Sequence, residues 1–289
     1  MIEVVKSGLL STVQDLGRPG YAHLGVARSG ALDPPALVAA NRLVGNPDGA
    51  AGLETTLTGV TLRAEVQTVV AVTGARAVIR VDGEPVTFGS AFPVRAGALV
   101  EVGPAELGVR TYVGFAGGVS VAPVLGSRST DTLSALGPPP LRPGFVLPLG
   151  RSSPDPQTVP VTDGGGVLDE RAAGDPVVVR LRFGPRHDWF SVTARDALLE
   201  SPYTLSVKSN RVGARLSGTA LTRAIAGELP SEGMVLGAVQ VPADGQPLIF
   251  LADHPTTGGY PVIGVVDGAD LPLLAQARPG TIVRFAPWT

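Results

Sequence analysis

Glycine and proline interrupt this chain along its whole length, and these interruptions constrain its fold more than any other feature. The 289 residues include 38 glycines and 27 prolines, so few stretches are long enough for a helix of several turns. Both residue types favour turns and disfavour the interior of a helix. The sequence therefore predicts a mainly β protein with short strands and a few short helices.

The length suits two mid-sized units better than one compact domain. Nine of the 27 prolines lie in residues 138–176, which also contain the run Asp163-Gly164-Gly165-Gly166. We therefore expect an N-terminal β-barrel domain at 1–137, a Pro/Gly-rich connection at 138–176 and a C-terminal β-barrel domain at 177–289.

Segments rich in β-branched residues and bounded by turn residues are expected to be strands. The clearest helix begins at Asp33, whose carboxylate can cap the first turn, and ends at Gly45. Further helices are expected at 188–199 and at about 270–277. The expected strands are 68–72, 77–81, 99–102, 109–115, 177–181, 203–207, 247–252, 262–266 and 282–285.

Composition argues against several partners and compartments. A net charge of −2 and a pI near 5.9 provide no basic surface for nucleic acid. No apolar run approaches the ~20 residues needed to cross a membrane, and the N-terminus lacks a signal-peptide core. The chain has no cysteine, so nothing indicates an oxidising compartment. We expect a cytoplasmic protein.

The scarcity of reactive side chains excludes several chemistries. The only lysines are Lys6 and Lys208, and neither follows a glycine as in a Walker A loop. Neither is flanked by methionines, so the chain is expected to carry no covalent biotin. The three histidines are far apart, no metal-ligand spacing occurs, and no metal site is expected.

The polar run Asp253–Pro261 follows an expected strand and is the strongest candidate ligand loop. Gly258 and Gly259 would let its backbone present N–H groups to an anion or a carbonyl oxygen. A tight hydrogen-bonded turn is the alternative. His254 lies within this run, either as a solvated turn residue or as a proton-transfer group.

Three further polar clusters contain candidate site residues. Arg211 and Arg215 are four residues apart, so on a strand they would face the same side and could grip a carboxylate or phosphate. Surface salt bridges are the commoner use of such a pair. Asp15 and Arg18 flank a tight turn in the second cluster, and the third is the run Ser29–Asp33, followed later by Glu54.

Taken together, these clusters resemble the 5-oxoprolinase C subunit, a family also called the biotin-dependent carboxyltransferase family, allophanate hydrolase subunit 2 or the kinase-inhibitor antagonist family. The similarity runs from Ser11 to Phe285, in order. The segments that carry it are Gln14–Gly20, Ser29–Asp33, Ala40–Asn46, Leu125–Thr130, Ser209–Leu216, Pro230–Gly233 and Asp253 with Thr256–Pro261.

The resemblance implies a tandem of two cyclophilin-like β-barrel domains. It also implies a hetero-oligomer with a homologue of the B subunit, which is itself similar to a kinase inhibitor. The A subunit, of a different fold, is a further expected partner. Such complexes are hydrolases that open 5-oxoproline, a lactam, to L-glutamate with ATP hydrolysis. ATP is therefore the expected cofactor of the complex.

The resemblance also implies two alternatives. One is a carboxyltransferase that moves CO2 from carboxybiotin to a urea-like amide, and the other is a non-enzymatic regulator that binds a kinase inhibitor. For the 5-oxoprolinase hypothesis, the expected catalytic residues are Asp253, Thr256, Thr257 and Tyr260. The expected substrate-binding residues are Asp15, Arg18, Asn210, Arg211, Arg215, Gly258 and Gly259.

Overall fold

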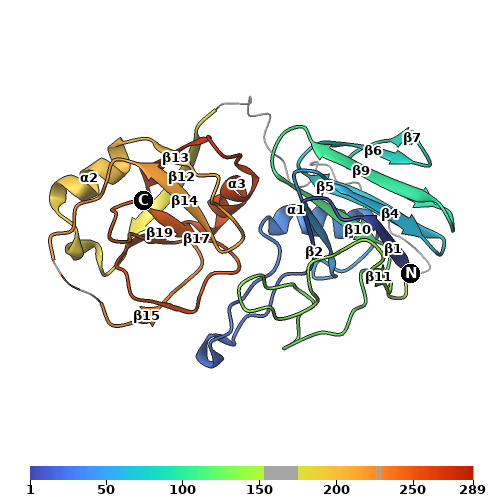
Figure 1. Cartoon of the computed structure of the whole chain (residues 1–289), viewed down its shortest axis with the longest axis horizontal. Coiled ribbons are helices and arrows are strands. Elements are labelled where there is room, and N and C mark those ends of the chain that lie inside the picture. The colour runs from blue at the N-terminus through green and yellow to red at the C-terminus, as the bar shows by residue number, and fades with distance from the viewer. Residues whose placement is uncertain (153–174, 226, 228, 289) are drawn as a thin grey trace. The chain divides into compact units, whose positions relative to one another are not determined.

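The structure, a computed structural model, describes residues 1–152, 175–225, 227 and 229–288. These residues form two compact units (Figure 1). The first unit holds residues 1–18 and 29–152, and the second holds 19–28 and the described residues from 175 onward. Most of the expected connection at 138–176 lies outside the described residues.

The first unit contains two antiparallel sheets. The six-stranded sheet has the order β11 (Val146–Leu147), β1 (Ile2–Lys6), β4 (Val60–Ala64), β9 (Leu99–Ala105), β6 (Ala77–Val81) and β7 (Glu84–Val86). The five-stranded sheet has the order β2 (Leu10–Gln14), β3 (Gly52–Thr56), β10 (Arg110–Phe115), β5 (Thr68–Gly74) and β8 (Ala91–Val94).

Apolar side chains from both sheets form one core. Leu62 and Val100 of the six-stranded sheet are buried together with Val72 and Val113 of the five-stranded sheet. The alternation of buried and exposed residues in β6 shows that one face of the six-stranded sheet is directed to this core. Burial of this apolar surface is the main stabilising contribution to the first unit.

Helix α1 (Pro34–Leu43) packs on the other face of the five-stranded sheet. The Asp33 carboxylate caps its first turn by accepting a hydrogen bond from the Ala36 N–H at 3.1 Å, as expected from the sequence. A Cβ at Gly114 of β10 would lie 2.8 Å from the Ala40 carbonyl oxygen. This close approach explains why glycine occupies position 114.

The second unit is a closed seven-stranded barrel. Its β12 and β20 are parallel, and its other neighbours are antiparallel. The strand order is β12 (Val177–Phe183), β19 (Val262–Val266), β16 (Ala238–Gln240), β17 (Leu248–Phe250), β14 (Gly213–Gly218), β13 (Tyr203–Leu205) and β20 (Ile282–Pro287). The prediction of a mainly β protein with a few short helices is confirmed.

Two further helices lie in the second unit, α2 (Val192–Glu200) and α3 (Leu271–Gln276). A helix was expected at 188–199, but α2 begins only at Val192, so the expected start was wrong. A short 3-10 turn at His187–Trp189 is followed by extended backbone at Phe190, and Ser191 then caps α2 by accepting from the Ala194 N–H. Phe190 is extended because it forms an isolated β-bridge with Arg223.

The predicted ligand loop, Asp253–Pro261, lies within the connection between β17 and β19. Both strands are antiparallel to β16, which lies between them, so they are parallel to each other and residues 251–261 must cross β16. A two-stranded sheet of β15 (Glu232–Gly233) and β18 (Thr257–Gly258) forms part of this crossing. The outward face of β16, including Gln240, is therefore buried beneath the connection.

Candidate functional site

The carboxylate of Asp253 begins the predicted ligand loop and is fully buried. Its two oxygens accept hydrogen bonds from Arg211, with Nε to Oδ2 at 2.9 Å and Nη2 to Oδ1 at 3.0 Å. The Asp253 N–H also donates to the Arg211 carbonyl oxygen at 3.1 Å, which extends the β14–β17 ladder. Within the barrel, the pair joins two of the segments that carry the family resemblance.

The expectation that Arg211 and Arg215 face the same side of a strand was wrong. Strand β14 begins only at Gly213, so Arg211 precedes it, and its side chain is 2% exposed. Arg215 lies within the strand and is exposed. The Asn210 side chain accepts from the Val212 N–H at 2.9 Å, so Arg211 lies within a turn that ends just before β14 begins.

The segment Thr256–Tyr260 is held by its backbone while several of its side chains reach the surface. The Thr256 carbonyl oxygen accepts from the Met234 N–H at 2.8 Å, and Thr257–Gly258 pairs with Glu232–Gly233. The Tyr260 carbonyl oxygen accepts from Gln240 Nε2 at 3.2 Å. Thr257 is exposed, Tyr260 is 46% exposed, and Gly259 is partly exposed.

His254 is neither solvated nor presented with this segment. It is buried, its Nδ1 lies 2.7 Å from the Pro255 carbonyl oxygen, and its ring packs against Phe250. Its surroundings give it a packing role beneath the connection.

Glu232 anchors the two-stranded sheet to the rest of the barrel. Its carboxylate accepts from Arg186 Nε at 3.0 and 3.1 Å and also from Nη2. These hydrogen bonds lower the pKa of Glu232 and raise the pKa of Arg186. The Pro230–Gly233 motif is thereby fixed against the 3-10 turn after β12.

Arg223 is a cation beside this segment that sequence reasoning missed. Its Cζ lies 5.6 Å from the centroid of the Tyr260 ring, and its Nη2 donates to the Val241 carbonyl oxygen at 2.7 Å. Arg223 lies outside the segments that carry the family resemblance, and only the folding of the chain brings it close to Tyr260.

In the first unit, Asp15 and Arg18 lie against the motif Leu125–Thr130. The Asp15 carboxylate accepts from the Ser127 hydroxyl and the Arg128 N–H at 2.6 Å each. It also accepts from the Ser129 hydroxyl at 2.5 Å and the Gly17 N–H at 2.8 Å. Arg18 is buried and donates to the Ser129 carbonyl oxygen. Both predicted substrate-binding residues therefore hold a loop in place.

A second buried network in the first unit supports the start of α1. Glu54 Oε2 accepts from the Tyr112 hydroxyl at 2.8 Å and from the Leu32 N–H at 2.9 Å. The same hydroxyl accepts from the Asp33 N–H at 2.8 Å. Burial, with the nearby Glu54 charge, raises the pKa of Tyr112 well above its usual value. This network fixes the motif Ser29–Asp33 on the sheet.

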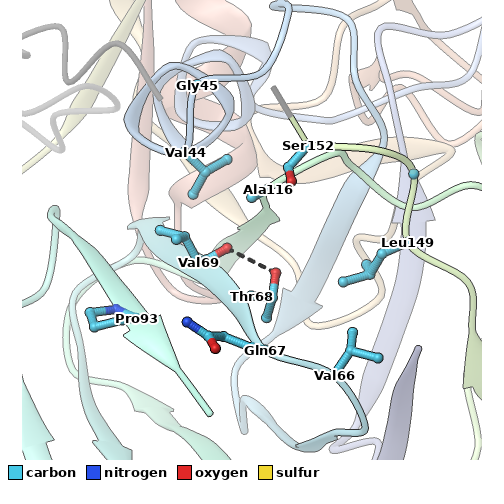
Figure 2. Close-up of a pocket in the computed structure, with 11 residues that line it drawn as sticks. Val44, Gly45, Val66, Gln67, Thr68, Val69, Pro93, Ala116, Leu149 and Ser152 are labelled. Carbon is cyan, nitrogen blue, oxygen red and sulfur yellow. Dashed lines mark hydrogen bonds between the residues drawn. The ribbon is translucent and has the colours of Figure 1, made fainter. Parts of the chain in front are cut away.

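The first unit also contains a cavity of about 410 Å3 at the end of α1 (Figure 2). No charged side chain and no predicted site residue lines it, so it offers no counter-charge for a carboxylate or a phosphate. Figure 2 shows the Thr68 hydroxyl directed at the Val69 carbonyl oxygen, at 3.5 Å. The lining residues are Val44, Gly45, Val66, Gln67, Thr68, Val69, Pro93, Ala116, Leu149, Gly150 and Ser152.

Two kinds of feature are absent from the described part of the chain. Within it, no group of three or more His, Cys, Asp or Glu side chains is arranged to hold a metal ion. None of the helices that the structure describes is both long enough and apolar enough to span a membrane.

Comparison with known proteins identifies the family. Residues 24–287 match the family described as the carboxyltransferase domain, subdomain A and B. The 5-oxoprolinase C subunit of Escherichia coli (strain K12) is 39% identical over 288 residues, which are 99% of this chain and 90% of that protein. Urea amidolyase of Saccharomyces cerevisiae is 30% identical over 303 residues, which are 99% of this chain and 16% of that protein.

Solved structures agree with this assignment. The crystal structure of Kluyveromyces lactis urea carboxylase matches 100% of this chain with a TM-score of 0.92 and 29% identity, and the chain covers 27% of that protein. Across five solved chains that it matches, this chain spans between 19% and 56% of the other protein. The chain therefore belongs to the carboxyltransferase domain, subdomain A and B, family, and its resemblance to the 5-oxoprolinase C subunit is confirmed.

Proposed function

We propose that this chain is the C subunit of an ATP-dependent 5-oxoprolinase and acts in a complex with homologues of the B and A subunits. The observation that carries the proposal is the 39% identity to the 5-oxoprolinase C subunit of Escherichia coli along 99% of this chain. The identity to urea amidolyase is lower, at 30%. ATP, the partner subunits and a cytoplasmic location are parts of this proposal.

The proposed reaction uses ATP to open a stable lactam ring. Transfer of the ATP γ-phosphoryl group to the lactam oxygen makes C5 of the ring electrophilic, and water then attacks C5. Cleavage of the C–N bond gives the free amine and an acyl phosphate. A second water attacks the carbonyl carbon of the acyl phosphate through an oxyanion intermediate, and inorganic phosphate leaves. The balanced products are L-glutamate, ADP and phosphate.

The exposed part of the β17–β19 connection suits the stabilisation of a developing oxyanion. The Thr257 hydroxyl and the Gly259 backbone lie on a segment whose position is fixed by β15 and Gln240. Preorganised donors aimed at a developing negative charge are among the strongest catalytic contributions. In this proposal Arg211 and Asp253 hold the connection in place and do not contact substrate, because each already binds the other.

The test is ATP hydrolysis dependent on 5-oxoproline in the complex of the three subunits. Thr257→Val is expected to lower kcat by about 100-fold if its hydroxyl contacts the oxyanion. The control is Thr204→Val, which removes an exposed hydroxyl from β13 of the same barrel. Unchanged kcat in Thr257→Val would refute the residue assignment, whereas an inactive wild-type complex would refute the function.

Carboxyl transfer to a urea-like amide is the second candidate. The family description and the TM-score of 0.92 to Kluyveromyces lactis urea carboxylase favour it. It requires a biotinylated carrier on another protein. Urea-dependent ATP hydrolysis with a biotin carboxylase partner, and none with 5-oxoproline, would support this function instead. A complex that hydrolyses no ATP with either substrate but relieves a protein kinase from inhibition would indicate the regulator.

A further inference from the structure

Among the residues that the structure describes, the Arg223 guanidinium has no acidic partner, and it lies beside the exposed segment Thr257–Tyr260. It forms no ion pair with any residue that the structure describes, and its Nε is buried there without a hydrogen-bond partner. The only hydrogen bond of its side chain to described residues is from Nη2 to the Val241 carbonyl oxygen. The buried Nε is out of a ligand's reach, but the Nη hydrogens that do not bond to Val241 remain available to a ligand.

The backbone around Arg223 is fixed on both sides. Arg223 pairs with Phe190 in an isolated β-bridge, and the Ala224 N–H donates to the Trp189 carbonyl oxygen at 2.8 Å. Val241, which accepts from the side chain, is itself bonded through its N–H to the Pro261 carbonyl oxygen at 3.0 Å. The backbone that carries the guanidinium is thus fixed before any ligand arrives, and the side chain is tied to Val241.

The local charge balance leaves Arg223 as the uncompensated cation among the described residues of this region. Arg186 is neutralised by Glu232, and Arg211 is neutralised by Asp253. The Tyr260 ring gives Arg223 a cation–π contact at 5.6 Å but brings no negative charge. A partly buried guanidinium without a counter-ion favours binding of an anion.

We propose that Arg223 and the hydroxyl of the half-exposed Tyr260 bind an oxyanion of the substrates, either the carboxylate of 5-oxoproline or a phosphate group of ATP. The assignment rests on the proposed function and gives that site its anion-binding group. The guanidinium fork can hold two oxygens of the ligand, and the Tyr260 hydroxyl can donate to one of them. Bound in this way, the ligand lies against the exposed segment Thr257–Tyr260.

The direct test is an NMR titration of the full chain that follows the Arg223 Nε–H signal, identified by its loss in Arg223→Lys. The probes are 5-oxoproline, inorganic phosphate and 2-pyrrolidinone, which has the lactam ring without the carboxylate. A shift with 5-oxoproline alone assigns the carboxylate, and a shift with phosphate alone assigns ATP. No shift with either anion, or an equal shift with 2-pyrrolidinone, overturns the proposal.

A kinetic test uses the complex. Arg223→Gln is expected to raise the KM for 5-oxoproline or for ATP by about tenfold or more, with little change in kcat. The control is Arg182→Gln, which removes a guanidinium stacked 4.4 Å from the Trp288 ring on the same barrel. An equal rise in both variants, or no rise in Arg223→Gln, overturns the proposal. The titration still decides the anion site if the wild-type complex hydrolyses no 5-oxoproline.

Discussion

Arg211 and Asp253 form a bidentate ion pair in which neither side chain is more than 2% exposed. The two residues lie in separate motifs, and the backbone of one bonds to the backbone of the other. Because both charges are satisfied internally, the pair fixes the start of the β17–β19 connection. We interpret these residues as the structural base of the exposed segment Thr257–Tyr260.

Replacing Asp253 by Asn should destabilise the second unit strongly. The change leaves Arg211 charged and buried without its counter-ion, which costs about 3–5 kcal/mol in the free energy of unfolding. Urea unfolding followed by circular dichroism measures this change. The matched control is Asp48→Asn, because Asp48 forms the same kind of pair with Arg42 at the surface. The control should change stability little. If Asp253→Asn is as stable as wild type but inactive, Asp253 has a chemical role instead.

Gly258 should tolerate no side chain without moving Gln240. A Cβ at Gly258 would lie 2.7 Å from Gln240 Nε2, the atom that donates to the Tyr260 carbonyl oxygen. Gly258→Ala should therefore cost about 1 kcal/mol through the lost hydrogen bond. On the paired strand, a Cβ at Gly233 would meet no atom within 4 Å, so Gly233→Ala is the control.

Double-mutant analysis of Gly258 and Gln240 distinguishes this explanation from a general intolerance of the loop. Once Gln240→Ala has removed the amide, Gly258→Ala should cost little more, so the two effects should not add. Additive losses in thermal unfolding would contradict the proposed contact.

The buried tyrosines should make the protein less stable at alkaline pH. Burial raises the pKa of Tyr203 from 10.0 to about 12. The unfolded chain therefore loses this proton before the folded chain does, so the stabilisation is complete below about pH 10 and decreases as pH rises toward 12. Tyr203→Phe should show a smaller decrease in unfolding free energy over this interval. If absorbance at alkaline pH shows all four tyrosines of the folded protein ionising together near their usual pKa, this prediction fails.

Local sequence patterns predicted the regular elements well. The strands expected at 77–81 and 262–266 have the observed bounds, and Asp33 caps α1 as expected. Gly97 and Gly280, at φ 85° and φ 90°, occupy the turns before β9 and β20. These features depend on neighbouring residues, so the sequence contains the information directly.

Contacts between distant residues were less predictable. Arg211 and Arg215 were expected to act together, yet Arg211 lies in the turn before β14 and its partner is Asp253. Strands β15 and β18 have two residues each, which is too short for a periodic pattern. The position of Arg223 beside Tyr260 arises from the bridge with Phe190, a tertiary contact that also displaced the start of α2.

The central claim, that this chain is the C subunit of a 5-oxoprolinase, is tested most directly by measuring glutamate formed from 5-oxoproline. The measurement compares the purified A and B subunits with ATP, in the presence and in the absence of this chain. We predict that glutamate and ADP form in equal amounts only when the chain is present. Glutamate formation at the same rate without the chain, or none with all three subunits and ATP, would contradict the account.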